Sequence, residues 1–187
     1  MSSTSRGGIR ETSDYYVTPV SEIVKFLEAW DDINPWEDWK ILDPCAGGDE
    51  LRDRMSYPYA LAKYSFSCDT IDIREDSRAA VVGDHLNINC KDKYHLIITN
   101  PPFALAQEIA IKAINDVLPR GFVVLLLRLN FFGSQKRFGF WQKYPPYAIF
   151  IHTQRMSFTG GTTDSIEYMH CVWKKGYNSN QVILRII

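Results

Sequence analysis

The chain lacks any close pairing of its cysteines, which excludes a disulfide-rich scaffold and disfavours a zinc centre. No Cys-x-x-Cys pair occurs, and no cysteine has a histidine partner at zinc-ligand spacing; the four stand apart as Cys45, Cys68, Cys90 and Cys171. Reduced thiols of this kind are typical of proteins that stay in the cytosol. We therefore expect a cytoplasmic protein with no metal site.

A secretion signal and long apolar runs are missing as well. Residues 1–10 show no signal-peptide pattern. The longest apolar run, Phe122–Leu127, is far shorter than a helix that crosses a bilayer. The sequence therefore predicts a soluble protein with no membrane partner.

Acidic residues are absent from one long stretch, although the net charge of the whole chain is only −1. Residues 117–163 contain no Asp or Glu, whereas the basic side chains there are Arg120, Arg128, Lys136, Arg137, Lys143 and Arg155. A surface with charge of one sign can hold a polyanion such as nucleic acid. The alternative is that these side chains only solvate a surface rich in aromatic residues.

The length and composition predict one folded unit. A chain of 187 residues with 45% hydrophobic content can bury a full core. Residues 1–13 are rich in Ser, Thr, Gly and Arg, and we expect them to form a disordered tail. Residues 14–187 show no internal repeat and no sign of a second domain, so we expect a single domain there.

Hydrophobic patterning predicts strands that alternate with helices. Strands are expected over residues 39–43, 65–73, 79–84, 94–99, 122–129, 148–153, 166–173 and 181–187. Thr18 is expected to cap a first helix that begins at Pro19, and further helices are expected from about Asp49, over residues 103–118 and over residues 134–143. This order predicts an α/β fold with a doubly wound, mostly parallel sheet and an antiparallel edge hairpin near the C-terminus.

Polar side chains follow four of the predicted strands: Asp43, Asp72, Asp84 and Asn100. In a doubly wound sheet, ligands bind outside the carboxyl ends of the strands. The small residues after Asp43 let a ligand approach the backbone, but they include neither a phosphate loop nor a Gly-x-Gly-x-x-Gly fingerprint. Taken alone, Asp72 could equally be a solvated strand end, and Asp84 could be a helix N-cap.

The loop Thr99–Phe103 is stiff, because two prolines follow Asn100. Each proline fixes its φ angle near about −65° and removes a backbone N–H. The Asn100 amide, the loop carbonyls and the Phe103 ring are therefore held in set directions, which suits a planar group that carries N–H donors. The alternative is a proline-rich turn that only ends a core strand.

In order and spacing, these motifs resemble the amino-group S-adenosylmethionine-dependent methyltransferases, and above all the small bacterial and phage DNA N6-adenine methyltransferases. The resemblance rests on Asp-Pro-Cys-Ala-Gly-Gly at 43–48, Asp72, Asp84 and Asn-Pro-Pro-Phe at 100–103. Two further stretches are similar to that family: Asp-Tyr-Tyr-Val-Thr-Pro at 14–19, and Arg-Met-Ser-Phe-Thr-Gly-Gly at 155–161. The resemblance covers nearly all of the chain from Asp14 to Trp173. Its Asn-Pro-Pro-Phe motif is specific for methylation of planar amino groups, whereas its cofactor motifs are shared more widely.

The resemblance implies a Rossmann-like methyltransferase domain that binds S-adenosyl-L-methionine and DNA. The implied cofactor-binding residues are Tyr16, Thr18, Pro19, Asp43, Ala46, Gly47, Asp72, Asp84 and Asn100. The implied catalytic motif is Asn100, Pro101, Pro102 and Phe103, in which Asn100 and the Pro101 carbonyl accept the two amino hydrogens and Phe103 stacks on the target ring. The expected DNA-contacting side chains are Lys136, Arg137, Lys143 and Arg155.

One position departs from the family pattern. The family commonly has a second Gly two residues after Gly47, where this chain has Asp49, which we expect to cap the next helix and point away from the cofactor. The chain has little room for a target-recognition domain, so we expect weak or short sequence specificity or a protein partner that supplies recognition. Methylation of RNA, methylation of a protein glutamine, and a non-catalytic subunit with the same fold remain alternatives.

Overall fold

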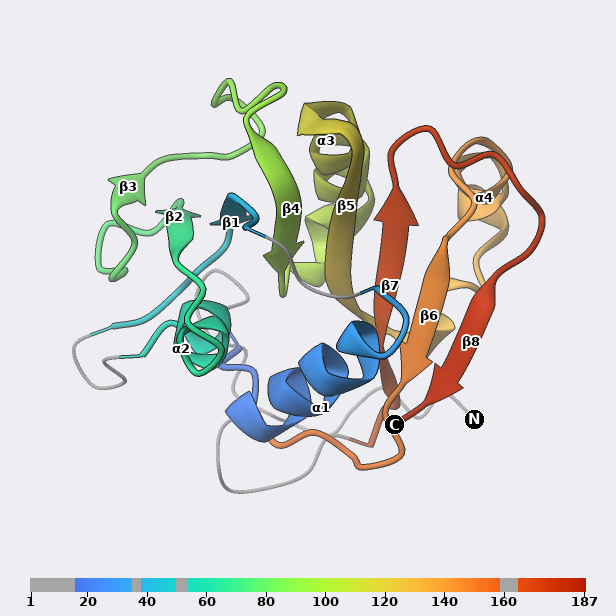
Figure 1. The fold of residues 1–187 in the computed structure, drawn as a ribbon, viewed down its shortest axis with the longest axis horizontal. Coiled ribbons are helices and arrows are strands. Elements are labelled where there is room, and N and C mark those ends of the chain that lie inside the picture. The colour runs from blue at the N-terminus through green and yellow to red at the C-terminus, as the bar shows by residue number, and fades with distance from the viewer. Residues whose placement is uncertain (1–15, 35–37, 50–53, 159–164) are drawn as a thin grey trace, which may run out of the picture.

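One mixed sheet organises the molecule. The computed structural model describes residues 16–34, 38–49, 54–158 and 165–187. Within these residues, eight strands are hydrogen-bonded in the order β3-β2-β1-β4-β5-β7-β6-β8 (Figure 1). The expected tail at residues 1–13, and residues 159–161 of the late loop, lie outside the described ranges. No helix in these ranges combines the length and the apolar character needed to cross a membrane.

The first part of the sheet is parallel and the last part is mixed. Parallel pairing joins β1 (Ile41–Asp43), β2 (Cys68–Asp72), β3 (Val81–Val82), β4 (Tyr94–Thr99) and β5 (Val117–Arg128). The later strands are β6 (Ala148–Ile151), β7 (Tyr168–Lys174) and β8 (Ile183–Ile186). Strand β7 is antiparallel to both β5 and β6, and β8 is parallel to β6. The predicted doubly wound sheet with an antiparallel C-terminal hairpin is confirmed.

Helices cover both faces of the sheet, as Figure 1 shows. Helices α1 (Val20–Asp31) and α2 (Ser56–Ala62) share a hydrophobic cluster with Leu96 and Ile98 of β4. Helices α3 (Ala106–Asp116) and α4 (Phe138–Lys143) share a second cluster with Ile97. Successive side chains of a strand point to opposite faces, so β4 contributes to both layers of the core.

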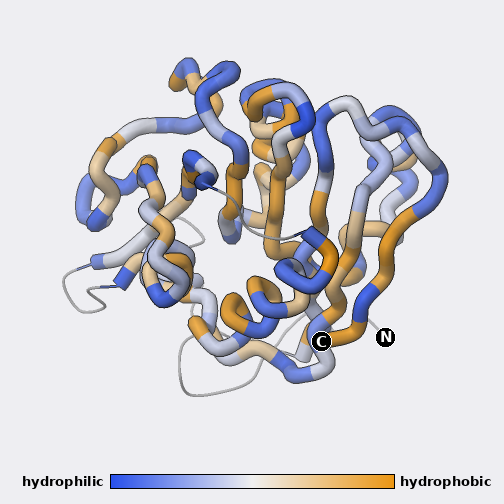
Figure 2. Tube along the Cα trace, viewed as in Figure 1, coloured by the Kyte–Doolittle hydropathy of each residue, from blue (hydrophilic) through white to orange (hydrophobic). Residues whose placement is uncertain are grey.

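The central strands are apolar on both sides, which is why they are buried between helices. Strand β5 has Val124 in the cluster beneath α1 and α2, and Val123 and Leu125 in the cluster beneath α3. Figure 2 shows hydrophobic residues along much of β5, whereas α1 alternates between hydrophobic and hydrophilic residues. This pattern confirms the interpretation of residues 122–129 as a central strand.

Several predicted boundaries were wrong. Helix α1 begins at Val20 with Pro19 at the N-cap position, and no side chain caps it, because the Thr18 hydroxyl accepts a hydrogen bond from Asn100 instead. Asp49 is not helical, and α2 begins only at Ser56.

The helix predicted over residues 103–118 is also divided. A 3₁₀ turn covers Phe103–Leu105, and α3 ends at Asp116 because Val117 is already extended. Val117 pairs with Tyr94, and regular pairing resumes at Phe122 opposite Leu96. Pro119 and Gly121, which follow the predicted helix, therefore lie in the irregular first part of β5.

Candidate functional site

The loops after β1, β2, β3 and β4 open on one cavity, because the carboxyl ends of parallel strands meet at the same edge of the sheet. The cavity encloses about 800 Å³ of empty space, including open solvent at its mouth. Among the predicted site residues, those on its wall are Tyr16, Thr18, Asp43, Ala46, Asp72, Asp84, Asn100 and Pro102. The predicted residues that the described wall does not include are Pro19, Gly47, Pro101 and Phe103.

The glycine loop after β1 is tied to the end of β2. Gly47 and Gly48 have φ angles of 65° and 79°, which side-chain-bearing residues rarely adopt. In this conformation the Gly47 N–H donates to Oδ2 of Asp72 at 2.7 Å, and the Arg74 N–H donates to Oδ1 at 2.9 Å. Two backbone N–H groups thus fix the orientation of the Asp72 carboxylate, which lies on the cavity wall. Its oxygens can still accept a hydrogen bond from a hydroxyl group.

Asp84 caps a turn. Its Oδ1 atom accepts from the Leu86 N–H at 2.9 Å and its Oδ2 atom accepts from Nδ2 of Asn87 at 2.8 Å. The residues after Asp84 form a turn and no α-helix, so the alternative of a helix N-cap was wrong. Because Asp84 also lines the cavity, these contacts hold the carboxylate in place beside any ligand there.

Asp43 is buried at the end of β1 with no cation within ion-pair distance among the described residues. Only about 1% of its surface is exposed, and its Oδ1 atom accepts from the Cys45 N–H at 3.2 Å. Burial raises the pKa of Asp43 to about 7, with a further rise from the nearby Asp72 charge, although hydrogen bonds oppose the shift. A cationic ligand in the cavity would favour the ionised form.

Asn100 is held in one orientation by the segment that precedes α1. Its Nδ2 atom donates to the Tyr16 carbonyl at 3.2 Å and to the Thr18 hydroxyl at 3.0 Å. The Tyr16 carbonyl can only accept, so it fixes which end of the amide is the NH₂ group. The Oδ1 atom is buried and has no hydrogen-bond partner among the described residues. Asn100, a residue of the cavity wall, therefore has an acceptor that no described residue uses.

An aromatic cluster surrounds Phe103. Its ring centroid lies 6.2 Å from that of Tyr16 and 5.9 Å from that of Tyr168. The Arg128 guanidinium stands over the Phe103 ring at 4.3 Å. Phe158, from the predicted late loop, packs edge-on against Tyr16 at 5.9 Å. The late loop and the Asn-Pro-Pro-Phe loop therefore meet, although Phe103 itself lies beside the cavity rather than on its described wall.

The predicted basic residues differ in their surroundings. Lys136 and Lys143 are exposed, whereas the Arg137 guanidinium stacks over Phe131 at 4.0 Å. Arg155 is exposed and lies 3.7 Å from Glu167 in an ion pair. Two aromatic residues of α4, Phe140 and Trp141, pack on the core against Trp173 of β7.

A buried chain of hydrogen bonds connects the cavity wall with the surface. Tyr57 lines the cavity, and its hydroxyl lies 2.9 Å from Nε2 of His170. His170 Nδ1 lies 2.7 Å from His152 Nε2, and His152 Nδ1 lies 3.0 Å from Oε2 of Glu22. Glu22 Oε1 is 3.0 Å from the partly exposed ammonium of Lys25.

The Glu22 carboxylate sets the direction of this chain, because it can only accept. His152 then donates from Nδ1, and its Nε2 accepts from Nδ1–H of His170. Burial lowers the pKa of both histidines, which favours their neutral forms. His170 Nε2 accepts from Tyr57 O–H, so the Tyr57 oxygen has only lone pairs left. No local motif singles out Tyr57 or His170, and sequence reasoning missed both.

Comparison with known proteins identifies the fold. No protein-family model and no curated protein matches the chain. A putative class I S-adenosylmethionine-dependent methyltransferase from Listeria monocytogenes aligns with a TM-score of 0.66 at 14% identity, over 96% of this chain and 68% of that one. A putative RNA methyltransferase from Pyrococcus horikoshii aligns with a TM-score of 0.64 at 13% identity, over 92% and 94% of the two chains.

A modification subunit of a putative type I restriction enzyme from Vibrio vulnificus is also similar. Its TM-score is 0.63 at 12% identity, and the match covers 92% of this chain but only 47% of the subunit. This chain thus spans about half the length of that protein. Together these likenesses show that the chain has the Rossmann-like fold of class I S-adenosylmethionine-dependent methyltransferases.

Replacing Asp43 should remove a pH-dependent loss of stability. The pKa of Asp43 is about 7 in the folded protein, whereas it is 3.8 for an unshifted group. The folded state therefore binds the proton more tightly than the unfolded state does. Stability therefore falls as pH rises from about 4 to 7, by about 1.4 kcal/mol per pH unit and about 4 kcal/mol in total. We expect Asp43→Asn to abolish this loss in urea denaturation of the ligand-free protein.

Exposed Glu75 supplies the control for this experiment, since Glu75→Gln also removes one carboxylate. The difference in unfolding free energy between Asp43→Asn and wild type should grow with pH, whereas that for Glu75→Gln should stay constant. Parallel stability curves for Asp43→Asn and wild type would show that the carboxyl is not desolvated.

Removing the acceptor at the end of the buried chain should destabilise the protein. Glu22→Leu keeps a side chain of similar volume but leaves the His152 donor buried without a partner. We expect the free energy of unfolding to fall by about 2 kcal/mol in urea titrations. Glu28→Leu on the exposed side of the same helix is the matched control. Equal effects of the two substitutions would argue against a stabilising role for the chain.

Proposed function

We propose that the protein is an S-adenosylmethionine-dependent methyltransferase that acts on the N6 amino group of adenine in DNA. The observation that carries the proposal is the Oδ1 atom of Asn100, which is buried and without a partner among the described residues. A buried acceptor without a hydrogen bond is costly, so its retention at a cavity wall suits a ligand that supplies an N–H.

The cavity wall fits the cofactor. Asp43, Asp72 and Asp84 all line it, and the cofactor carries a sulfonium and an ammonium group that an acidic wall would hold. In the proposed arrangement Asp72 binds the ribose hydroxyls and Asp84 binds the adenine amino group. The bound cofactor supplies an electrophilic methyl group. Side chains and backbone groups of this chain bind and orient the target amino group.

Asn100 and Pro101 act on the target amino group. The lone pair of an exocyclic amino group is delocalised into the ring, which makes the nitrogen a poor nucleophile. Acceptance of its two hydrogens by Asn100 Oδ1 and the Pro101 carbonyl would draw it towards tetrahedral geometry and stabilise the developing positive charge. The nitrogen becomes acidic once it carries the methyl group, and its extra proton passes to water, so no strong base is required.

Phe103 supplies the stacking surface for the target ring, a contact worth about 1–3 kcal/mol per base. The Arg128 guanidinium already stands over the ring at 4.3 Å. A base that stacks on this face therefore takes the place of Arg128. A base inside a duplex cannot reach the site, so the target must be flipped or single-stranded.

DNA is favoured as the polymer by the Asn-Pro-Pro-Phe motif and by the likeness to a restriction-enzyme modification subunit. RNA is the second candidate, because a putative RNA methyltransferase is similar over nearly its whole length. The segment between β5 and α4 carries Lys136 and Arg137, which would hold a phosphate backbone. A protein partner would supply further target recognition.

The test is methyl transfer from isotope-labelled cofactor to DNA and RNA present together, with mass spectrometry of the nucleosides. We expect labelled N6-methyldeoxyadenosine. Label found in RNA nucleosides or in protein glutamine, and absent from DNA, would show that RNA or protein is the substrate. Bound cofactor with no transfer to any acceptor would instead indicate a non-catalytic subunit.

Asn100→Ala supplies the active-site variant for this assay. We expect its kcat to fall at least about 100-fold, which corresponds to about 3 kcal/mol in the transition state. Asn115→Ala on exposed α3 surface is the matched control and should keep wild-type activity. An unchanged rate for Asn100→Ala would contradict the proposed role.

Removing exposed basic side chains should weaken DNA binding in a salt-dependent way. For the double substitution Lys136→Ala and Lys143→Ala, we expect the slope of log K against log salt to fall by about 0.9 for each lost phosphate contact. Fluorescence anisotropy with a labelled oligonucleotide measures this slope. Exposed Lys63, the residue directly after α2, supplies the control as Lys63→Ala, and the proposed surface fails if both variants behave alike.

A further inference from the structure

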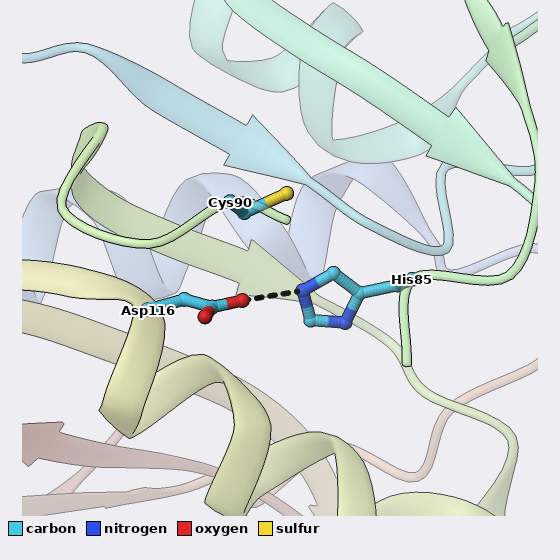
Figure 3. Close-up of side chains that lie close together, drawn as sticks. All are labelled: His85, Cys90 and Asp116. Carbon is cyan, nitrogen blue, oxygen red and sulfur yellow. Dashed lines mark ion pairs between the residues drawn. The ribbon is translucent and has the colours of Figure 1, made fainter. Parts of the chain in front are cut away.

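Three buried residues with metal-ligand side chains meet next to the cavity. His85 and Cys90 belong to the loop between β3 and β4, and Asp116 is the last residue of α3. They are exposed by only 3%, 3% and 6%, and one donor atom from each lies within 4.8 Å of the others. Figure 3 shows the His85 ring directed towards the Asp116 carboxylate, with the Cys90 sulfur beside the gap between them.

His85 is incompletely satisfied in this position. Neither of its ring nitrogens has a hydrogen-bond partner among the described residues. Oδ2 of Asp116 lies 3.6 Å from Nε2, which is too long for a hydrogen bond. Buried polar groups are nearly always paired, because desolvation without a compensating contact is costly. The imidazole therefore points to a ligand that supplies the missing interaction.

The donor set matches a zinc-class ion. Zinc binds thiolate sulfur, imidazole nitrogen and carboxylate oxygen, and three protein ligands with one open position are a recognised arrangement. Tetrahedral bonds of 2.0–2.3 Å place the donor atoms about 3.3–3.8 Å apart. The observed spread of at most 4.8 Å thus requires an inward movement on the order of 1 Å.

A cation already stands at the cluster. The Lys112 ammonium contacts Oδ2 of Asp116 and donates to the Ile88 carbonyl at 2.9 Å. This contact balances the Asp116 charge but leaves the His85 nitrogens without partners. The Lys112 side chain is 22% exposed, so it has a path to solvent. An incoming metal ion would have to displace it from Asp116.

We propose that His85, Cys90 and Asp116 form a binding site for a divalent transition-metal ion of the zinc class. The ion takes the place of the Lys112 ammonium beside Asp116 when it binds. On binding, the Cys90 thiol releases its proton to solvent and coordinates as thiolate. The ion then joins the loop after β3 to the end of α3. Since Asp84 directly precedes His85, the ion would steady one wall of the cavity, and this inference stands apart from the proposed methyl transfer.

The test is a zinc titration of chelator-treated full-length protein in competition with a chromophoric chelator. We expect one ion per chain and a higher thermal unfolding temperature with zinc, because the ion binds the folded state. Cobalt substitution should give a thiolate-to-metal charge-transfer band. His85→Gln and Cys90→Ser should each weaken binding at least about tenfold, whereas Cys68→Ser, on β2, should bind as wild type.

Lys112→Gln tests the exchange. Removing the competing ammonium should tighten zinc binding about tenfold, provided that circular dichroism shows the variant folded without metal. Absence of zinc binding by both wild type and Lys112→Gln would overturn the site. Equal affinity of wild type, His85→Gln and Cys90→Ser would overturn it too, since the ion would then bind elsewhere.

Discussion

The double hydrogen bond from the Asn100 amide to Tyr16 and Thr18 is the constraint on which the candidate site depends. It joins the loop after β4 to the segment before α1, which lies 84 residues away in sequence at Tyr16. Both amide hydrogens are used on this side, so the carbonyl oxygen must face away from it. The same contact removes Thr18 from helix capping. One interaction thus determines the direction of an acceptor and the path of the N-terminal segment.

Burial gives the acidic side chains of the cavity different properties. Asp72 and Asp84 each accept two hydrogen bonds from N–H groups, which hold their carboxylates in place. Asp43 lies deeper, and burial raises its pKa to about 7. Of the three carboxylates, Asp43 would therefore be affected most by a cationic ligand. The ligand would stabilise the ionised form of Asp43, which burial in the protein disfavours.

Polar groups in the core link the cavity to other parts of the fold. Tyr57, His170, His152 and Glu22 form a chain whose direction follows from the carboxylate at its end. On the other face of the sheet, His85 connects the loop after β3 to α3 through Asp116. The residues Tyr57 and His85, which both line the cavity, thus lie beside buried polar groups of other elements.

The sequence by itself determined the fold class, the central strand β5 and the four polar strand ends. Apolar residues on both faces predict β4 and β5, and the two prolines after Asn100 end β4 where it was predicted to end, because these signals act over a few residues. Only the tertiary structure decided that Thr18 binds Asn100, that Tyr57 reaches His170 and that Cys90 meets Asp116. Tyr57 and His170 are 113 residues apart, and such contacts arise from how helices and loops pack on the sheet, which no local propensity specifies.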